Sequence, residues 1–426
     1  MTTASLDSSA RSRGAEGIPA LTGIRAIAAF TIVAGHLHPQ NLELTILGMP
    51  LFFTLSGFII HYVYADTFAG SWRTAARIFA GARFSRIYPL YVALLAVALI
   101  TSQMWRTLYH TANIPAIVGY LFACWTWLPL TAGGHSLQDW DYNISWSVAT
   151  EIFFYVSYAL VFYRLARIRS ARSCLIALIG LCIGAYAWFY FLFVTRDIWE
   201  GFLLQHVSGF TPRTVDFANS LYRWFLYFSP YSRIFEFVGG CLTCQLFLLL
   251  RRDGGLQIQR RLSWLAWLAT ALIAVVFALY LSVAFTHPWL LTDNHSLVAF
   301  FISLHMNFLF APLYYTLFLS LAFGRSTLSR LLSSSVAVLL GEISYSTYLS
   351  HWLAAGFIAN STIGNLHHII IAQMLMVYLF SWMLYTSLEV PAKTILRRLF
   401  ATLTLSRPPS VAAGLSGTAP DRRPAE

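Results

Sequence analysis

Ten apolar segments, each long enough to cross a lipid bilayer, follow one another along this chain of 426 residues. They lie near residues 21–38, 48–65, 86–104, 146–163, 173–194, 230–250, 262–285, 298–322, 333–358 and 368–390. Hydrophobic residues make up 58% of the chain and charged residues only 11%, with a mean hydropathy of +0.64. A water-soluble domain is far less apolar. We therefore expect an all-α, polytopic bundle of ten transmembrane helices.

Arginine residues gather between alternate apolar segments, and this pattern sets the expected topology. One side of the membrane receives, besides both termini, Arg73, Arg77, Arg83, Arg86, Arg164, Arg167, Arg169, Arg172, Arg251, Arg252, Arg260, Arg261, Arg325 and Arg330. The opposite loops carry only Arg106, Arg196, Arg213 and Arg223. Cytoplasmic loops are the arginine-rich ones, so both termini are expected in the cytoplasm. The pattern also accounts for the formal net charge of +11 without a nucleic-acid partner.

An eleventh apolar segment, 114–130, has a proline near each end. If it crossed the membrane, every later loop would change sides and the arginine-rich segment 164–172 would lie outside. We therefore expect a re-entrant or interfacial segment here. The predicted organisation is a cytoplasmic N-terminal tail (1–20), a transmembrane domain (21–398) and a disordered cytoplasmic tail (399–426).

The first apolar segment carries two ionisable residues, Arg25 and His36. Eleven positions are close to three helical turns, so both side chains share one helix face, about 16 Å apart along the axis. Ionisable groups inside a span are costly and indicate a functional site. The alternative is an arginine that reaches toward the interface and a histidine that packs between helices.

An arginine pair and a glutamate in two further apolar segments suggest binding and acid–base chemistry. Arg83 and Arg86 share a helix face at the cytoplasmic mouth of the third segment, where two guanidinium groups can bind phosphate. Ordinary charge anchoring is the alternative. Glu151 falls in the outer half of the fourth segment. A carboxylate there could orient His36, or it could pair with an arginine and hold helices together.

The segment 341–352 is the most polar stretch of the second half of the chain. We consider Glu342, Tyr345 and His351 as supporting site residues. The sequence has no Walker A motif, no dinucleotide fingerprint and no H-E-x-x-H motif, so we expect neither a metal nor a permanently bound cofactor.

Four motifs in order resemble those of membrane acyltransferase family 3, the bacterial integral-membrane O-acyltransferases. They are Arg25 with His36, the R-x-x-R pair Arg83 and Arg86, the block from Trp146 to Tyr155, and the block from Ser344 to His351. The resemblance extends from Leu21 to about Arg398. The block that holds Glu151 reads SVATE, where the family more often has a shorter Ser-Leu-x-x-Glu run.

The resemblance implies an acyl-coenzyme A donor, usually acetyl-coenzyme A, which arrives from the cytoplasm of a bacterium with the enzyme in its inner membrane. The acceptor is a hydroxyl group of a cell-surface or exported carbohydrate, such as lipopolysaccharide, exopolysaccharide or a lipid-linked sugar. In this interpretation His36 is the general base and Glu151 its partner, while Arg25, Arg83 and Arg86 bind the donor. Either the membrane domain acylates the acceptor directly, or a separate extracytoplasmic protein completes the transfer.

Two alternatives remain open at this point. The acceptor could be a small molecule, such as a macrolide or lipo-oligosaccharide. A multi-pass transporter would also bury ionisable residues, but it favours symmetry between the two halves and helices broken at matching positions. The sequence shows neither of these features.

Overall fold

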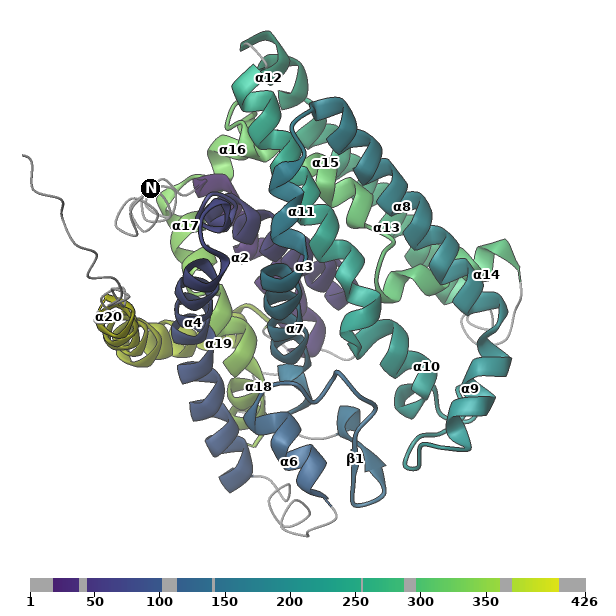
Figure 1. The fold of residues 1–426 in the computed structure, drawn as a ribbon. Coiled ribbons are helices and arrows are strands. Elements are labelled where there is room, and N and C mark those ends of the chain that lie inside the picture. Colours follow the sequence, from purple (N-terminus) through teal and green to yellow (C-terminus); the bar gives the residue numbers. More distant parts are fainter. Residues whose placement is uncertain are drawn as a thin grey trace, which may run out of the picture.

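The computed structural model describes residues 18–37, 44–101, 113–139, 142–253, 256–286, 296–360 and 370–405. Nearly all the regular structure in these ranges is helical, which confirms the predicted all-α class (Figure 1). The only sheet within them is a short antiparallel hairpin, β1 (Thr131–Ala132) with β2 (His135–Ser136).

The inner helices of the bundle come from both halves of the chain. They are α2 (Pro19–Leu37), α3 (Thr45–Tyr64), α4 (Trp72–Thr101), α7 (Trp146–Leu160), α11 (Pro230–Asp253) and α18 (Ser344–Asn360). Helix α17 (Ser335–Glu342) packs on α2 from outside, with Gly341 as its buried residue. Helices α3 and α11 approach at glycines: a Cβ atom on Gly57 would lie 1.9 Å from the Phe237 carbonyl oxygen, and one on Gly240 would lie 2.0 Å from that of Thr54. Small residues permit such close contact in membrane bundles.

The outer helices expose apolar side chains instead. In α8 (Ala171–Val194) and α13 (Leu265–Thr286), 17% and 11% of the apolar stretch is buried, against 72% for α3. Exposed side chains on α13 include Leu268, Leu272, Val275 and Leu279. Their spacing of three and four residues places them on one face. An exposed apolar face of this length is suited to lipid.

Within the described residues, seven helices are long and apolar enough to cross a membrane. An eighth span results if α14 (Leu297–Ser303) and α15 (Ala311–Ala322) are counted together across a 52° bend. The ten predicted spans are therefore not confirmed. Helix α7 has only 15 residues, and the segment 333–358 is divided at Ile343 into α17 and α18.

The remaining elements lie between and around these helices. They are α6 (Ile114–Leu121), α9 (Arg196–Leu204), α10 (Leu221–Arg223), α12 (Leu256–Ser263), α16 (Thr327–Leu332), α19 (Ile370–Leu384), α20 (Val390–Leu405), η2 (Thr67–Ala69), η4 (Leu137–Asp139), η5 (Asn143–Ser145), η6 (Phe162–Arg167), η7 (Phe217–Asn219), η8 (Trp224–Phe228), η10 (Leu304–Met306) and η12 (Tyr385–Glu389). Residues 114–130 form the short helix α6 followed by turns, so this segment does not cross the bundle.

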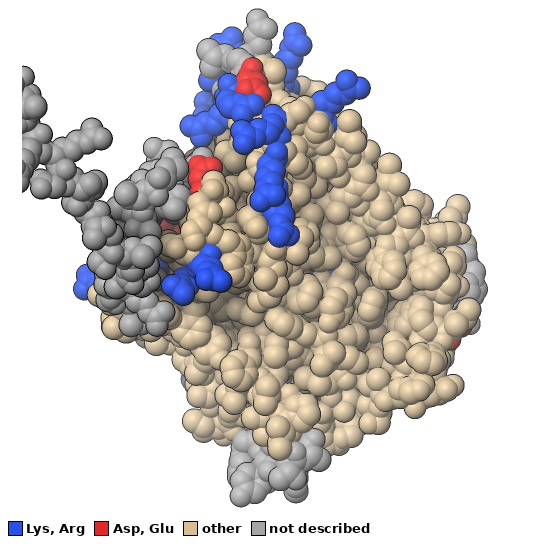
Figure 2. All heavy atoms as spheres, in the orientation of Figure 1, with Lys and Arg blue, Asp and Glu red and all other residues tan. Residues whose placement is uncertain are grey.

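Charge is distributed unevenly between the two ends of the molecule. Figure 2 shows that Lys and Arg side chains on the visible face gather toward the end that carries α12 and α16, while the opposite end is almost uncharged. The Arg252 guanidinium donates to the Arg169 carbonyl oxygen (3.4 Å), so two arginine-rich segments meet at this end. Near α9, Arg213 is instead paired with Asp197 (2.5 Å) and Glu200 (2.8 Å).

Candidate active site

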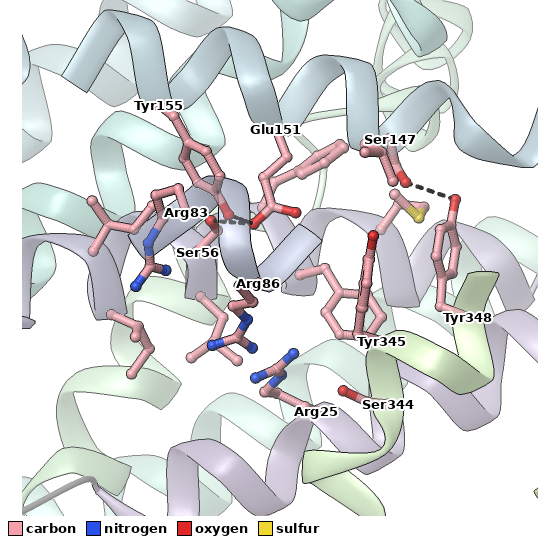
Figure 3. A pocket seen from close by; sticks show the side chains of 17 residues that line it. Arg25, Ser56, Arg83, Arg86, Ser147, Glu151, Tyr155, Ser344, Tyr345 and Tyr348 are labelled. Atoms are coloured by element: carbon pink, nitrogen blue, oxygen red, sulfur yellow. Dashed lines mark hydrogen bonds between the residues drawn. The ribbon is translucent and has the colours of Figure 1, made fainter. Parts of the chain in front are cut away.

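A pocket lies between α2, α3, α4, α7 and α18, with about 740 Å³ of space between its lining atoms (Figure 3). Its polar lining consists of Arg25, Ser56, Arg83, Arg86, Ser147, Glu151, Tyr155, Ser344, Tyr345 and Tyr348. The structure therefore brings together five of the residues selected from the sequence: Arg25, Arg83, Arg86, Glu151 and Tyr345. They come from four helices, and more than 300 positions separate the first from the last.

Glu151 is held on the pocket wall by two hydroxyl groups. Its Oε1 atom accepts a hydrogen bond from Ser56 Oγ (3.0 Å) and another from the Tyr155 hydroxyl (2.6 Å). Tyr155 lies one turn further along α7, and Ser56 belongs to α3. These contacts correct the expected pairing of Glu151 with His36, because the carboxylate bonds to hydroxyl groups here and His36 meets another histidine.

The Arg83 guanidinium is held by aromatic side chains. Its Nη2 atom donates to the Tyr64 hydroxyl (2.9 Å), and its Cζ atom lies 5.0 Å and 5.8 Å from the ring centres of Tyr64 and Tyr155. Arg83 is only 8% exposed, and its Nε atom has no hydrogen-bond partner among the described atoms. A buried donor of this kind is costly unless a ligand satisfies it.

Arg25 and Arg86 face each other in the middle of the pocket (Figure 3). They are close enough to repel, and Arg25 also interacts electrostatically with Glu151 and Glu389. Like charges brought together in a site of reduced dielectric favour the binding of an anion.

The helix that carries Arg83 and Arg86 extends beyond the apolar segment. Helix α4 begins at Trp72, well before the apolar run that starts near residue 86. The preceding segment is rich in Ala and Arg, which are strong helix formers, so the helix extends past the hydropathy signal. The two arginines therefore lie inside the helix and not at its first turn, and their place at the cytoplasmic end of the apolar segment stays a prediction.

Tyr345 and Tyr348 attach α18 to the opposite wall of the pocket. The Tyr345 hydroxyl donates to the Ile87 carbonyl oxygen (2.8 Å), and the Tyr348 hydroxyl donates to that of Ile144 (2.8 Å). Ser147 Oγ donates in turn to the Tyr348 hydroxyl (2.9 Å). Glu342, which the sequence suggested as a supporting residue, is exposed at the end of α17 and is not part of the lining.

His36 and His351 form a stacked pair outside this lining. Their ring centres are 5.0 Å apart, and His351 Nε2 lies 3.2 Å from His36 Nδ1. The sequence analysis selected both residues but did not connect them. Tyr348 joins the pair to the pocket, since its ring centre is 6.0 Å from that of His351.

The hydrogen bonds of the pair assign its protons when both rings are neutral. His351 Nδ1 lies 2.6 Å from the Tyr348 carbonyl oxygen, which only accepts, so this nitrogen carries the proton. His351 Nε2 then accepts from the Nδ1–H group of His36. With the proton on Nδ1, the lone pair of His36 lies on Nε2, as a general base requires.

Glu389 is a site residue that the sequence analysis missed. It lies in η12, is 5% exposed, and its Oε2 atom accepts from Ser346 Oγ (2.6 Å). It interacts electrostatically with Arg86 and Arg25. The signal was present, because Glu389 is the only acidic residue in the apolar segment 368–390.

Comparison with known proteins identifies relatives of this chain. Residues 18–388 match a family model described as an acyltransferase domain. The acyltransferase MdmB of Streptomyces mycarofaciens is 31% identical over 169 residues, which cover 35% of this chain and 40% of that protein. The peptidoglycan O-acetyltransferase OatA of Listeria monocytogenes is 24% identical over 188 residues, covering 42% and 29%.

A third relative, protein 2 in the picA locus of Rhizobium radiobacter, is 39% identical over 80 residues, covering 18% of this chain and 41% of that protein. The chain thus matches less than half the length of each of these relatives. No solved structure matches it.

Proposed function

Because this chain belongs to membrane acyltransferase family 3, we propose that it transfers an acyl group from acyl-coenzyme A to a hydroxyl group of a cell-surface or exported carbohydrate. Acetyl is the expected acyl group, in line with the relative named as a peptidoglycan O-acetyltransferase. That name also supports a cell-envelope carbohydrate as the acceptor. Lipopolysaccharide and exopolysaccharide belong to the same proposed acceptor class.

The observation that carries this proposal is the convergence of Arg25, Arg83 and Arg86 on one pocket. Guanidinium groups bind phosphate through paired hydrogen bonds, and coenzyme A carries several phosphate groups. The apolar part of the lining, which includes Phe52 and Ile59, suits the uncharged pantetheine arm. We infer that the phosphates enter first and that the thioester lies further along α2, toward His36.

His36 supplies the base in this scheme. Its Nε2 atom removes the proton of the acceptor hydroxyl, and the oxygen attacks the thioester carbonyl carbon. A C–O bond forms, the C–S bond breaks, and the imidazolium returns the proton to the thiolate of coenzyme A. The hydrogen bond from His36 Nδ1 to His351 keeps the lone pair at Nε2.

The proposed orientation places the arginine-rich end with α12 and α16 in the cytoplasm of a bacterium, with the bundle in the inner membrane and both termini cytoplasmic. The donor then reaches the arginine pocket from the cytoplasm. The acceptor approaches from the other side, and His36 lies about three turns along α2 from Arg25.

The test uses purified full-length protein in nanodiscs with acetyl-coenzyme A labelled on the acetyl group. Free coenzyme A and protein-bound label are counted for the wild type, for His36→Ala and for His206→Ala, which removes an exposed histidine far from the pocket in sequence. We expect His36→Ala to lose about 10²–10⁴-fold in rate, as for removal of a general base. His206→Ala should match the wild type.

Normal turnover by a folded His36→Ala variant would remove His36 from the mechanism. Stable label on the wild type would show that the acyl group passes through the protein. If the wild type neither cleaved nor bound acetyl-coenzyme A, the proposed donor would be wrong.

A further inference from the structure

Helix α20 (Val390–Leu405) starts just beyond the last residue that matches the family, residue 388, and packs closely along α4. A Cβ atom on Gly81 would lie 3.1 Å from the Phe400 ring. The rings of Phe84 and Phe400 also meet edge to face, with centres 5.9 Å apart. This contact fixes α20 beside the turn of α4 that carries Arg83.

The face of α20 that follows Glu389 is cationic. Glu389, Lys393 and Arg397 are four positions apart, so they lie on one helix face. Lys393, the single lysine of the chain, interacts electrostatically with Arg86, Arg397, Glu389 and Arg83. Arg397 interacts with Arg83 and Arg86. The cations of α20 therefore face those of α4.

Positive charge is in excess where these helices meet. Five cationic side chains gather there: Arg25, Arg83, Arg86, Lys393 and Arg397. The accompanying carboxylates in the described part of the chain are Glu151 and Glu389, while the exposed Glu342 interacts with Tyr385.

Independent evidence that this region binds a ligand comes from Arg83. This residue lines the pocket, is almost fully buried, and leaves Nε without a hydrogen-bond partner among the described atoms. Repulsion between neighbouring cations is relieved when an anion binds between them. Both observations indicate a ligand with several negative charges.

We propose that Lys393 and Arg397 of α20 complete, with Arg83 and Arg86 of α4, a binding site for the phosphate groups of the acyl donor. This inference rests on the proposed use of acyl-coenzyme A. Two arginines offer planar pairs of donors to phosphate oxygens, and the lysine offers a compact charge. The nucleotide end of the donor is then held between α4 and α20, with its acyl arm directed into the pocket.

A phospholipid headgroup carries the same phosphate chemistry. The donor is favoured because the cations of α20 adjoin Arg86, which itself lines the pocket. A headgroup would need only the outer, exposed part of α20.

The experiment compares a donor that carries the phosphorylated nucleotide of coenzyme A with a donor that lacks it. The double variant Lys393→Gln/Arg397→Gln is assayed with acetyl-coenzyme A and with S-acetyl-pantetheine, which lacks the nucleotide. Loss of two charge-assisted contacts should raise KM for acetyl-coenzyme A about tenfold or more while kcat changes little. KM for S-acetyl-pantetheine should stay at the wild-type value.

Arg398→Gln is the matched control, since Arg398 is an exposed arginine at the next position of the same helix. It should leave KM unchanged for both donors. The charge-retaining variant Lys393→Arg/Arg397→Lys should keep KM for acetyl-coenzyme A near the wild-type value, which separates loss of charge from damage to α20. Adenosine 3′,5′-bisphosphate should inhibit the wild type more strongly than the double variant.

An equal rise of KM for both donors would overturn the inference, as would the same rise in Arg398→Gln. The lipid alternative is tested in nanodiscs of phosphatidylcholine with and without phosphatidylglycerol. If the double variant loses binding of phosphatidylglycerol but keeps its KM for acetyl-coenzyme A, the site belongs to lipid. Failure of the wild type with both donors would reject the proposed function itself.

Discussion

Two groups of buried charge lie on either side of Phe53, and they are built differently. On one side, Arg233 Nη1 donates to Glu236 Oε1 (3.0 Å), with side chains 1% and 0% exposed. Arg233 Nε donates to the Tyr227 carbonyl oxygen (2.9 Å). The rings of Tyr227, Trp146 and Phe53 cover the guanidinium, with centres 4.8, 5.5 and 5.7 Å from its Cζ atom.

On the other side of Phe53 lies the pocket, where Arg83 has a hydroxyl group and two rings as its described contacts, and where Arg25 faces Arg86. The Arg233–Glu236 pair contains its own counterion and is closed by rings. The pocket has more cations than anions and open space between them. A buried charge that is paired within the protein needs no ligand, whereas charges left in excess favour one.

The largest effect is expected at the closed pair. Arg233→Met leaves the Glu236 carboxylate buried without its partner, which should lower the free energy of unfolding by about 3–5 kcal/mol. Thermal unfolding in detergent measures this loss. The double variant Arg233→Met/Glu236→Leu removes both charges and should recover most of the stability, with acyl transfer preserved. If the double variant lost activity while remaining folded, the pair would have a role beyond the fold.

The opposite pattern is expected in the pocket. Arg83→Gln/Arg86→Gln removes the two contacts that we propose to the donor, each worth about 1.5–3 kcal/mol, so KM for acyl-coenzyme A should rise by about a hundredfold or more. The rate at saturating donor and the unfolding temperature should change much less. A selective loss of acceptor affinity would place the two arginines in the acceptor site, and a loss of stability like that of Arg233→Met would break the comparison.

A smaller effect is expected at His351, which contacts His36 and which we propose acts through it. His351→Ala removes the acceptor that fixes the proton on His36 Nδ1, a hydrogen bond worth about 0.5–1.5 kcal/mol. The rate at saturating donor should fall three- to tenfold, with KM unchanged. His351→Gln, whose amide oxygen also accepts a hydrogen bond, should restore part of the rate. Equal defects in both variants would argue that His351 only fills space between α2 and α18.

The sequence predicted the components of the site better than their connections. Helical spacing and the cost of buried charge selected six residues: Arg25, His36, Arg83, Arg86, Glu151 and His351. All of them except His36 and His351 line one pocket. The partner of His36 lies 315 positions away on another helix, and spacing along one helix cannot predict such a contact. The same limit applies to Glu151, for which the sequence left a histidine and an arginine open as partners and the structure shows two hydroxyl groups.

The helix ends predicted from hydropathy were wrong where protein rather than lipid surrounds the chain. Hydropathy detects the apolar part of α4 but not the arginine-containing turns that precede it. Helices α7 and α18 lie in the interior, where the length needed to cross a bilayer does not apply, and both are shorter than the apolar runs suggested. The segment 114–130, predicted to be re-entrant or interfacial, is not among the helices long enough to span, as the charge pattern of the whole chain had indicated.

The close contact between α3 and α11 also bears on how the protein is made. Cys241 Sγ donates to the Gly57 carbonyl oxygen across 184 positions of sequence. At about 5–20 residues per second, the ribosome needs about 10–40 s to synthesise the partner after α3 has emerged. During that interval the glycine face of α3 stands in the bilayer without α11, and Arg25 without Glu389. The translocon and lipid must therefore accommodate a half-built pocket until the last helices insert.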